Sequence, residues 1–252
     1  MSEISPLSID EWFLAKQLRN IKKGLHLPYN IKADITVFLN HYRERNSRPP
    51  LTALLIKSSS QLINEMPEIN QACFHTFYGL RKIRPTYNVV NIPMVVNIDG
   101  KSIVTATTIE NAYQKTLSQI HEEVKTKRPT NFEQMPLNKI IHLGKFRIWQ
   151  KIRLSLFHFI YSNFPNFYLK NRGGGICVSS LLNLAKDDCP VTMNAYGMTT
   201  FTISSCSIEK SPNDHIETIC VGVAFDHLIT HGMLGTRGII RLSEIIRENA
   251  KV

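Results

Sequence analysis

The most chemically suggestive stretch of the sequence is HIETICVGVAFDHLITHGMLGTRGII, near the C-terminus. An apolar run over 219–225 has the composition of a strand and ends at Asp226-His227, and His231-Gly232 precedes a helical pattern. A polar pair at the end of a rigid strand, beside an open turn, is where catalytic groups are often placed. Histidine suits general-base chemistry because its pKa lies near neutral pH. His227 is therefore the candidate base.

Two other interpretations of these histidines stay open. His227 and His231 are four positions apart, a spacing that also occurs in metal sites. A zinc site needs a third protein ligand and usually an acid that orients one of the ligands. The sequence has no H-E-x-x-H motif and no cysteine pair nearby, so we predict no metal. A lone histidine at a strand end also serves purely structural roles.

The composition is that of a globular chain. The 252 residues include 30 Lys and Arg against 20 Asp and Glu, a net charge of +10, with 43% apolar and 20% charged residues. These values exclude wholesale disorder, and the length allows a sizeable core.

We expect a cytoplasmic protein, because the sequence shows no signal peptide and no apolar run of membrane-spanning length. The scattered cysteines indicate free thiols: Cys73, Cys177, Cys189, Cys206 and Cys220.

Helical and strand patterns alternate along the chain without a regular βαβ rhythm. Helices are predicted over 8–23, 37–45, 51–66, 109–126 and 233–249, and strands over 29–35, 73–107 and in the segments ICVSS, MTTFTISSCSI and HIETICVGVAF. Asp99-Gly100, between two β-rich runs, indicates a type I′ hairpin. Together these patterns predict one α+β domain with a mainly antiparallel or mixed sheet.

Residues 125–172 differ from the rest of the chain, because they contain ten Lys or Arg and one acid, Glu133. The centre of this segment predicts an amphipathic basic helix. Its apolar face carries Phe146, Trp149, Ile152, Leu156 and Ile160, and its other face carries Lys151, Ser155 and His158. Three interpretations are open: a surface helix with a solvated charged face, a dock for an acidic carrier protein, and a helix on an anionic membrane surface. No nucleic-acid partner is expected, since no such motif accompanies the local charge.

The pattern FDH-x-x-x-x-G-x-x-G-x-R resembles the active-site signature of the dihydrolipoamide acyltransferases, the catalytic cores of the 2-oxo acid dehydrogenase complexes. Chloramphenicol acetyltransferases share that fold. Asp226, His227, Gly232, Gly235 and Arg237 match the signature. Leu228 replaces the usual Arg, and His231 replaces the usual Asp or Asn.

The resemblance extends over residues 8–124 and 173–249. GGGICVSSLLNL is similar to the family's G-x-F-T-I-S-S-L-G segment and places Ser179 at the serine that would stabilise the oxyanion. FTISSC at 201–206 is closer as a string, but Ser204 lies too near His227 in the sequence, so Ser179 is preferred. The chain is therefore interpreted as one catalytic domain, 1–252, with a basic helical insertion at about 125–172.

The resemblance implies an α+β, chloramphenicol acetyltransferase-like fold with a mixed sheet flanked by helices, assembled as a trimer with active sites between subunits. It implies acyl transfer between coenzyme A and a thiol or hydroxyl acceptor, with acyl-CoA as cosubstrate. His227 would be the general base, Ser179 the oxyanion donor, and His231 would hold the active-site loop.

The sequence identifies no residues that bind coenzyme A. The glycines at 173–175 are followed by no G-K-[ST], so they indicate a tight turn and not a phosphate loop. Because Leu228 and His231 depart from the family pattern, an alternative stays open. In that alternative the chain is an inactive trimeric scaffold, or a module of the same fold that binds a carrier protein or a membrane.

Overall fold

The computed structural model describes residues 26–77, 79–98, 100–135, 146–170, 173–180, 199–211, 215–227 and 230–251. The helix predicted over 8–23 lies outside these residues. The helices are α2 (Thr36–Glu44), α3 (Leu51–Glu65), α4 (Leu117–Thr126), α6 (Arg147–Asn163), α7 (Pro165–Lys170) and α8 (Gly232–Asn249), with short 3-10 helices η1 (Pro67–Ile69), η2 (Ala112–Gln114) and η3 (Phe132–Gln134). The strands are β1 (His26–Asp34), β2 (Ala72–Thr76), β3 (Gly79–Ile83), β4 (Val89–Ile98), β5 (Lys101–Glu110), β6 (Ile176–Ser180), β7 (Phe201–Lys210) and β8 (Glu217–Asp226).

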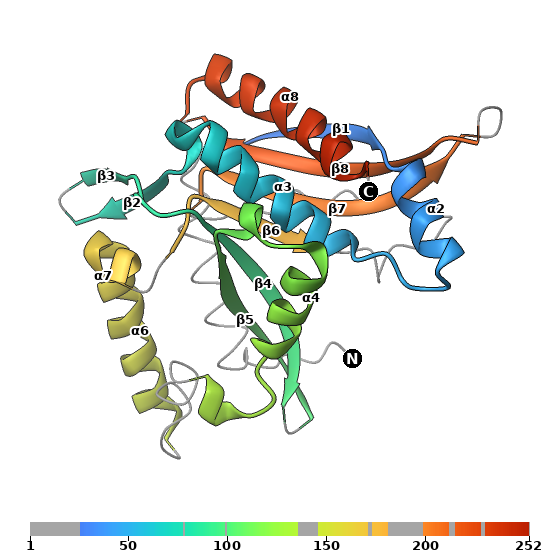
Figure 1. Ribbon diagram of the computed structural model, residues 1–252. Helices are drawn as coiled ribbons and strands as arrows, with labels where there is room; N and C mark the ends of the chain where they lie inside the picture. The colour runs from blue at the N-terminus through green and yellow to red at the C-terminus, as the bar shows by residue number, and fades with distance from the viewer. Residues whose placement is uncertain are drawn as a thin grey trace, which may run out of the picture.

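The described strands form one mixed sheet and one separate hairpin (Figure 1). The six-stranded sheet has the order β1-β8-β7-β6-β4-β5. β6 runs parallel to both β4 and β7, and the remaining neighbours are antiparallel. β2 and β3 pair only with each other as strands. The prediction of an α+β chain with a mixed sheet flanked by helices is confirmed.

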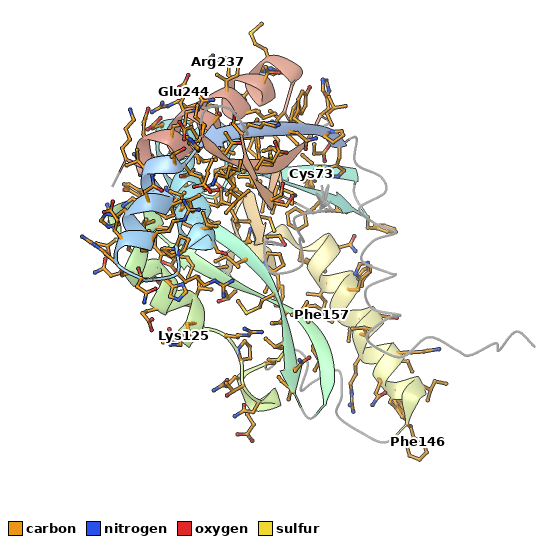
Figure 2. The ribbon with its side chains drawn as sticks, turned by 90° about the vertical axis from the view of Figure 1, so that its right-hand side faces the viewer. Cys73, Lys125, Phe146, Phe157, Arg237 and Glu244 are labelled. Carbon is orange, nitrogen blue, oxygen red and sulfur yellow. The ribbon has the colours of Figure 1, made fainter. Side chains whose placement is uncertain are left out.

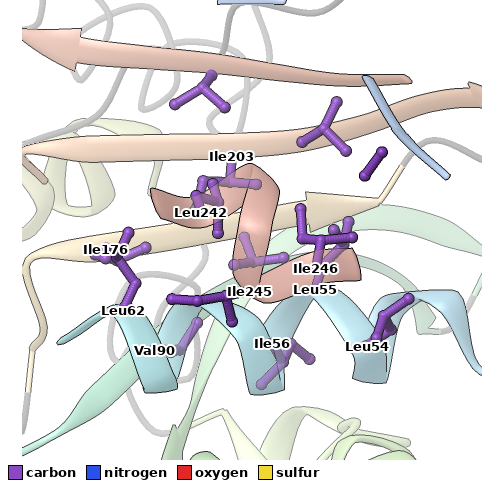
Figure 3. Close-up of a cluster of buried hydrophobic side chains, with 14 of the residues drawn as sticks. Leu54, Leu55, Ile56, Leu62, Val90, Ile176, Ile203, Leu242, Ile245 and Ile246 are labelled. Carbon is purple, nitrogen blue, oxygen red and sulfur yellow. The ribbon is translucent and has the colours of Figure 1, made fainter. Parts of the chain in front are cut away.

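Helices α3 and α8 cover one face of the large sheet and pack against each other (Figure 1). Alternate residues of each strand point toward them, as the pleat of a strand requires. The central cluster is drawn in Figure 3 and includes Leu54, Leu55, Ile56 and Leu62 of α3, Val90 of β4, Ile176 of β6, Ile203 of β7, and Leu242, Ile245 and Ile246 of α8. Burial of these side chains holds the strands that carry the candidate site.

The helix predicted over 109–126 is shorter than expected. β5 continues to Glu110, which pairs with Val89, because the β-branched run before it extends the hairpin with β4. α4 then begins at Leu117, where the Thr116 side chain accepts a hydrogen bond from the Gln119 backbone and the Gln119 side chain caps Thr116 in return. The predicted hairpin turn is confirmed, since Ile98 pairs with Lys101 across Asp99-Gly100.

The glycines before β6 serve close packing of the backbone. Gly175 donates its N–H to Asn70 Oδ1 at 2.7 Å, and the buried Asn70 amide donates to the carbonyls of Pro85 and Tyr87. A Cβ at Gly175 would lie 2.2 Å from the Gln71 nitrogen, so no larger residue fits. Asn70 therefore joins the turn after α3, the entry to β4 and the entry to β6.

Glycines also bring α8 onto the end of the sheet. Phe225, near the end of β8, is fully buried. A Cβ at Gly235 would lie 2.5 Å from Phe225 Cζ, and one at Gly238 would lie 3.1 Å from Phe201 Cζ. The two glycines, three positions apart on one helix face, let α8 rest directly on the two aromatic rings.

The start of β8 is tied to α2 by an ion pair. The Arg43 guanidinium donates two hydrogen bonds to the buried carboxylate of Glu217, one of them 2.7 Å from Nη2 to Oε1. The Glu217 backbone N–H donates to Thr36 Oγ1, and its carbonyl accepts from the Ile35 N–H. These contacts fix where β8 begins and so fix the register of the strand that leads to His227.

Arg43→Met should lower the free energy of unfolding more at pH 7 than near pH 3. Hydrogen bonds from Arg43 hold the pKa of Glu217 below its usual value, so their contribution is present above the ordinary glutamate pKa and is lost as pH falls through the lowered value. We expect a loss of about 1–3 kcal/mol at pH 7, toward the lower end because Arg43 is exposed. Urea unfolding of the variant measures it.

Arg45→Met, at an exposed arginine two positions along, is the control for this prediction and should change little at either pH. Equal losses for Arg43→Met at pH 7 and pH 3 would show that the ion pair is not the cause.

Gly235→Ala should destabilise the protein although alanine is the better helix former by about 1 kcal/mol. The added methyl group meets the Phe225 ring at 2.5 Å, and overpacking of this kind costs about 1–3 kcal/mol. Gly238→Ala is the matched comparison, since its methyl group has more room at 3.1 Å. Thermal unfolding should rank Gly235→Ala as the less stable variant, and the opposite ranking would contradict this packing.

Candidate active site

His227 follows β8 directly and is exposed to solvent. Its ring lies roughly parallel to that of Phe225, with the two centroids 6.2 Å apart and the planes at 26°. A Cβ at Gly232 would lie 3.3 Å from His227 Nε2. Glycine at this position of the D-H-x-x-x-x-G pattern therefore leaves space beside the nitrogen that would exchange a proton.

Backbone hydrogen bonds close the turn that carries His227. The Asp226 N–H donates to the Thr200 carbonyl, and the Asp226 carbonyl accepts from the Thr230 N–H, both at 3.0 Å. Thr230 is buried, and its hydroxyl makes no hydrogen bond to the part of the chain that the structure describes. The imidazole is thus exposed on a turn whose backbone is held from both sides.

The buried Asp226 side chain belongs to a second group of polar residues on the opposite side of the strand from His227. Asp226 is the direct pairing partner of His26 on β1. Burial lowers the pKa of His26, and the negative charge of Asp226 opposes that shift. Burial, and then the charge of Asp226, raise the pKa of the Cys73 thiol. His26 and Cys73 were not predicted as neighbours of the site, because pairing with β8 places His26 there and Cys73 comes from β2 in the separate hairpin.

His231 is exposed and immediately precedes α8. Its carbonyl accepts the Gly235 N–H at 3.1 Å, which starts the helix. Its side chain makes no capping hydrogen bond to α8. If His231 holds the loop, as expected, it does not do so by capping this helix. Leu228, the other departure from the family pattern, lies outside the described residues.

The two candidate serines lie side by side. Ser179 on β6 is paired with Ser204 on β7, and Ser204 is paired with Gly222 on β8. Both serines are buried on the sheet face opposite α3 and α8, because their neighbours Val178 and Ile203 point into the core. The Ser204 hydroxyl lies 3.4 Å from the Gly222 carbonyl. In the sequence the two serines belong to separate segments and are alternative candidates for the oxyanion donor. In the sheet they are neighbours.

Within one chain, however, Ser179 and His227 lie far apart. Ser179 is level with Gly222, which lies four residues before β8 ends at Asp226, and His227 comes after that end. Four residues of strand span about 13 Å, and β6 and β8 are separated by a further strand. The structure therefore does not bring the predicted base and the predicted oxyanion donor together in a single copy.

The structure describes three cysteines, none of them in a disulfide: Cys73, Cys177 and Cys220. Burial raises the pKa of Cys177 to about 12 and, with a hydrogen bond to Glu209, that of Cys220 to about 11. These thiols are therefore protonated at neutral pH and poor nucleophiles. Within the described residues no group of three or more His, Cys, Asp or Glu could hold a metal ion.

Comparison with known proteins adds fold-level information. No protein-family model matches the sequence, and a search of curated proteins finds no match. Among solved structures, dihydrolipoamide acetyltransferase of Azotobacter vinelandii aligns with a TM-score of 0.65 at 17% identity, covering 98% of this chain and 92% of that chain.

Two further structures agree with this one. The catalytic core of the 2-oxoacid dehydrogenase multienzyme complex of Thermoplasma acidophilum gives a TM-score of 0.66 at 14% identity, covering 98% of this chain and 99% of that chain. The cubic core of the pyruvate dehydrogenase multienzyme complex gives 0.65 at 17% identity, with 98% and 92% covered. The likeness predicted from the sequence is confirmed at the level of structure: the chain has the fold of the dihydrolipoamide acyltransferase catalytic cores.

Proposed function

We propose that the protein is an acyltransferase that moves an acyl group between coenzyme A and a thiol or hydroxyl acceptor. The observation that carries this proposal is the exposed imidazole of His227 at the end of β8, with Gly232 leaving Nε2 accessible, in this fold. A study of the Azotobacter vinelandii enzyme concerns a serine, a histidine and an asparagine in its catalytic mechanism. The asparagine there follows the histidine by four positions, as His231 follows His227.

The proposed reaction needs one base and one oxyanion donor. His227 takes the proton of the acceptor thiol or hydroxyl as the acceptor atom attacks the thioester carbonyl carbon. The carbonyl oxygen becomes an oxyanion, to which the Ser179 hydroxyl donates a hydrogen bond. Collapse of the intermediate breaks the carbon–sulfur bond, and the departing coenzyme A thiolate takes the proton from the imidazolium. No covalent acyl-enzyme is required.

The separation of Ser179 and His227 within one chain supports an active site shared between copies. Two groups separated by several residues of strand cannot act on one carbonyl carbon, since catalytic groups must lie within hydrogen-bond reach of the reacting atoms. A second copy that presents the sheet face carrying its Ser179 to the His227 turn would bring the groups together. A cyclic trimer provides such a head-to-tail contact three times. We therefore propose that assembly creates the site.

His227→Ala should abolish transfer from acyl-CoA to dithiol or hydroxyl acceptors, measured as release of free coenzyme A thiol. Ser179→Ala should lower the rate roughly a hundredfold, as expected for loss of one oxyanion donor. His231→Ala should fall between these variants and wild type, and His231→Asp should keep or raise activity. Ser204→Ala, on the neighbouring strand, is the matched control for Ser179→Ala and should be nearly neutral.

Each variant should also be checked for unchanged oligomeric state and thermal stability, so that a lost rate is assigned to chemistry. Full activity in a folded His227→Ala variant would eliminate this mechanism. If the wild-type protein transfers no acyl group to any acceptor, the inactive scaffold becomes the better account.

A further inference from the structure

Helix α6 carries a continuous apolar stripe that faces solvent. Positions 148, 152, 156 and 159 repeat at intervals of four, four and three, so they share one helix face, with 149 beside it. The exposed fractions are 66% for Ile148, 56% for Trp149, 50% for Ile152, 58% for Leu156 and 50% for Phe159. Phe146, just before the helix, is 72% exposed. Proteins seldom leave so large a contiguous apolar surface in water without a partner for it.

The stripe is not what attaches α6 to the rest of the protein. The helix packs mainly against β2 and α7 through the opposite side, where Leu154 and His158 are buried. The rings of Phe157 and Phe167 meet edge to face, and the Phe77 backbone N–H donates to Asn163 Oδ1. In Figure 2 the helix lies at the margin of the described part of the chain, with Phe146 at its outer end. The outward apolar face is therefore exposed in the part of the chain that the structure describes.

The charge around the stripe has one sign. α6 contains no Asp or Glu, and no acid occurs from 134 to 186. Residues 125–172 contain ten Lys or Arg against one acid. Lys151 and Arg153 lie on either side of the stripe, since their positions fall about 60° beyond its edges on a helical wheel of 100° per residue. Basic residues beside a solvent-facing apolar stripe are the pattern of a helix that lies in the interface of an anionic membrane.

We propose that α6 binds the surface of a membrane containing anionic lipids, with its axis in the plane of the bilayer. Trp149 and the neighbouring aliphatic residues would enter the boundary between headgroups and acyl chains, and the flanking basic residues would meet lipid phosphates. The helix does not cross the bilayer, as none of the described helices is long and apolar enough to do so. The proposal is independent of the acyltransferase function.

Two other partners fit the observations less well. An acidic carrier protein would satisfy the charge, but charge alone gives no reason for six large exposed apolar side chains. A second copy docked through its own α6 would place two acid-free basic segments against each other, which like-charge repulsion opposes. An anionic lipid surface satisfies the apolar stripe and the charge together.

The test is cosedimentation of the full-length protein with vesicles of phosphatidylcholine containing increasing fractions of phosphatidylglycerol. Binding should rise with the anionic fraction and weaken with added salt. A double variant, Ile152→Ser with Leu156→Ser, should reduce binding at least tenfold. Val37→Ser is the matched control, because Val37 is 59% exposed on α2, and it should bind as wild type does.

A second pair of variants tests the charge. Lys151→Gln with Arg153→Gln should weaken binding to anionic vesicles about tenfold or more. Arg45→Gln with Lys251→Gln removes the same charge from exposed positions outside the segment and should have a much smaller effect. All four variants should keep the wild-type urea midpoint, because the changed side chains are exposed or partly exposed.

Three results would overturn the proposal: no binding to any vesicle, equal binding to purely phosphatidylcholine vesicles, or binding that neither double variant weakens. Dissociation of an oligomer by the Ile152 and Leu156 changes, without vesicle binding by the wild type, would assign the stripe to a second copy instead. Charge-dependent capture of an acidic carrier protein without vesicle binding would assign the segment to that partner. None of these outcomes bears on acyl transfer, which is measured separately.

Discussion

The antiparallel pairing of β8 with β7 sets where the two candidate catalytic groups lie in this protein. β6 and β7 run in one direction and β8 returns in the other, so β8 carries His227 to the end of the sheet at which β6 and β7 begin. Ser179 lies near the other end of β6. This geometry separates the two groups in one chain and makes a shared site the simplest way to use both. The ion pair between Arg43 and Glu217 supports the same register from the start of β8.

The position of His227 also depends on the core beneath it. Phe225 is buried under α8, and Gly235 gives the helix room to rest on that ring. His227 in turn lies against Phe225, and Gly232 leaves space beside Nε2. The candidate base is therefore oriented by the same packing that closes the hydrophobic core. A flexible loop alone would not hold a proton acceptor in one orientation.

Local signals in the sequence predicted most of the helices and strands. The features that they did not predict depend on contacts between residues far apart in the chain. The hairpin at Asp99-Gly100 and the strand ending at Asp226 follow from neighbouring residues. Two features depend on pairing between strands far apart in the chain. They are the pairing of His26 with Asp226 and that of Ser179 with Ser204. The periodicity of α6 predicted an apolar face, but the exposed stripe includes Ile148 and Phe159, which the prediction left out, and not the predicted Ile160. Only the packing of the opposite side of the helix shows that this stripe is exposed.

The most direct test of a shared active site is complementation between two inactive variants. Subunits with His227→Ala and subunits with Ser179→Ala would be coexpressed with different tags, and the mixed assemblies purified through both tags or assayed after random assembly. If each site takes His227 from one subunit and Ser179 from the next in a trimer, random assembly should restore about a quarter of wild-type activity, because every mixed trimer contains one intact site. Activity no higher than that of the separate variants, in assemblies proven to be mixed, would contradict the shared site.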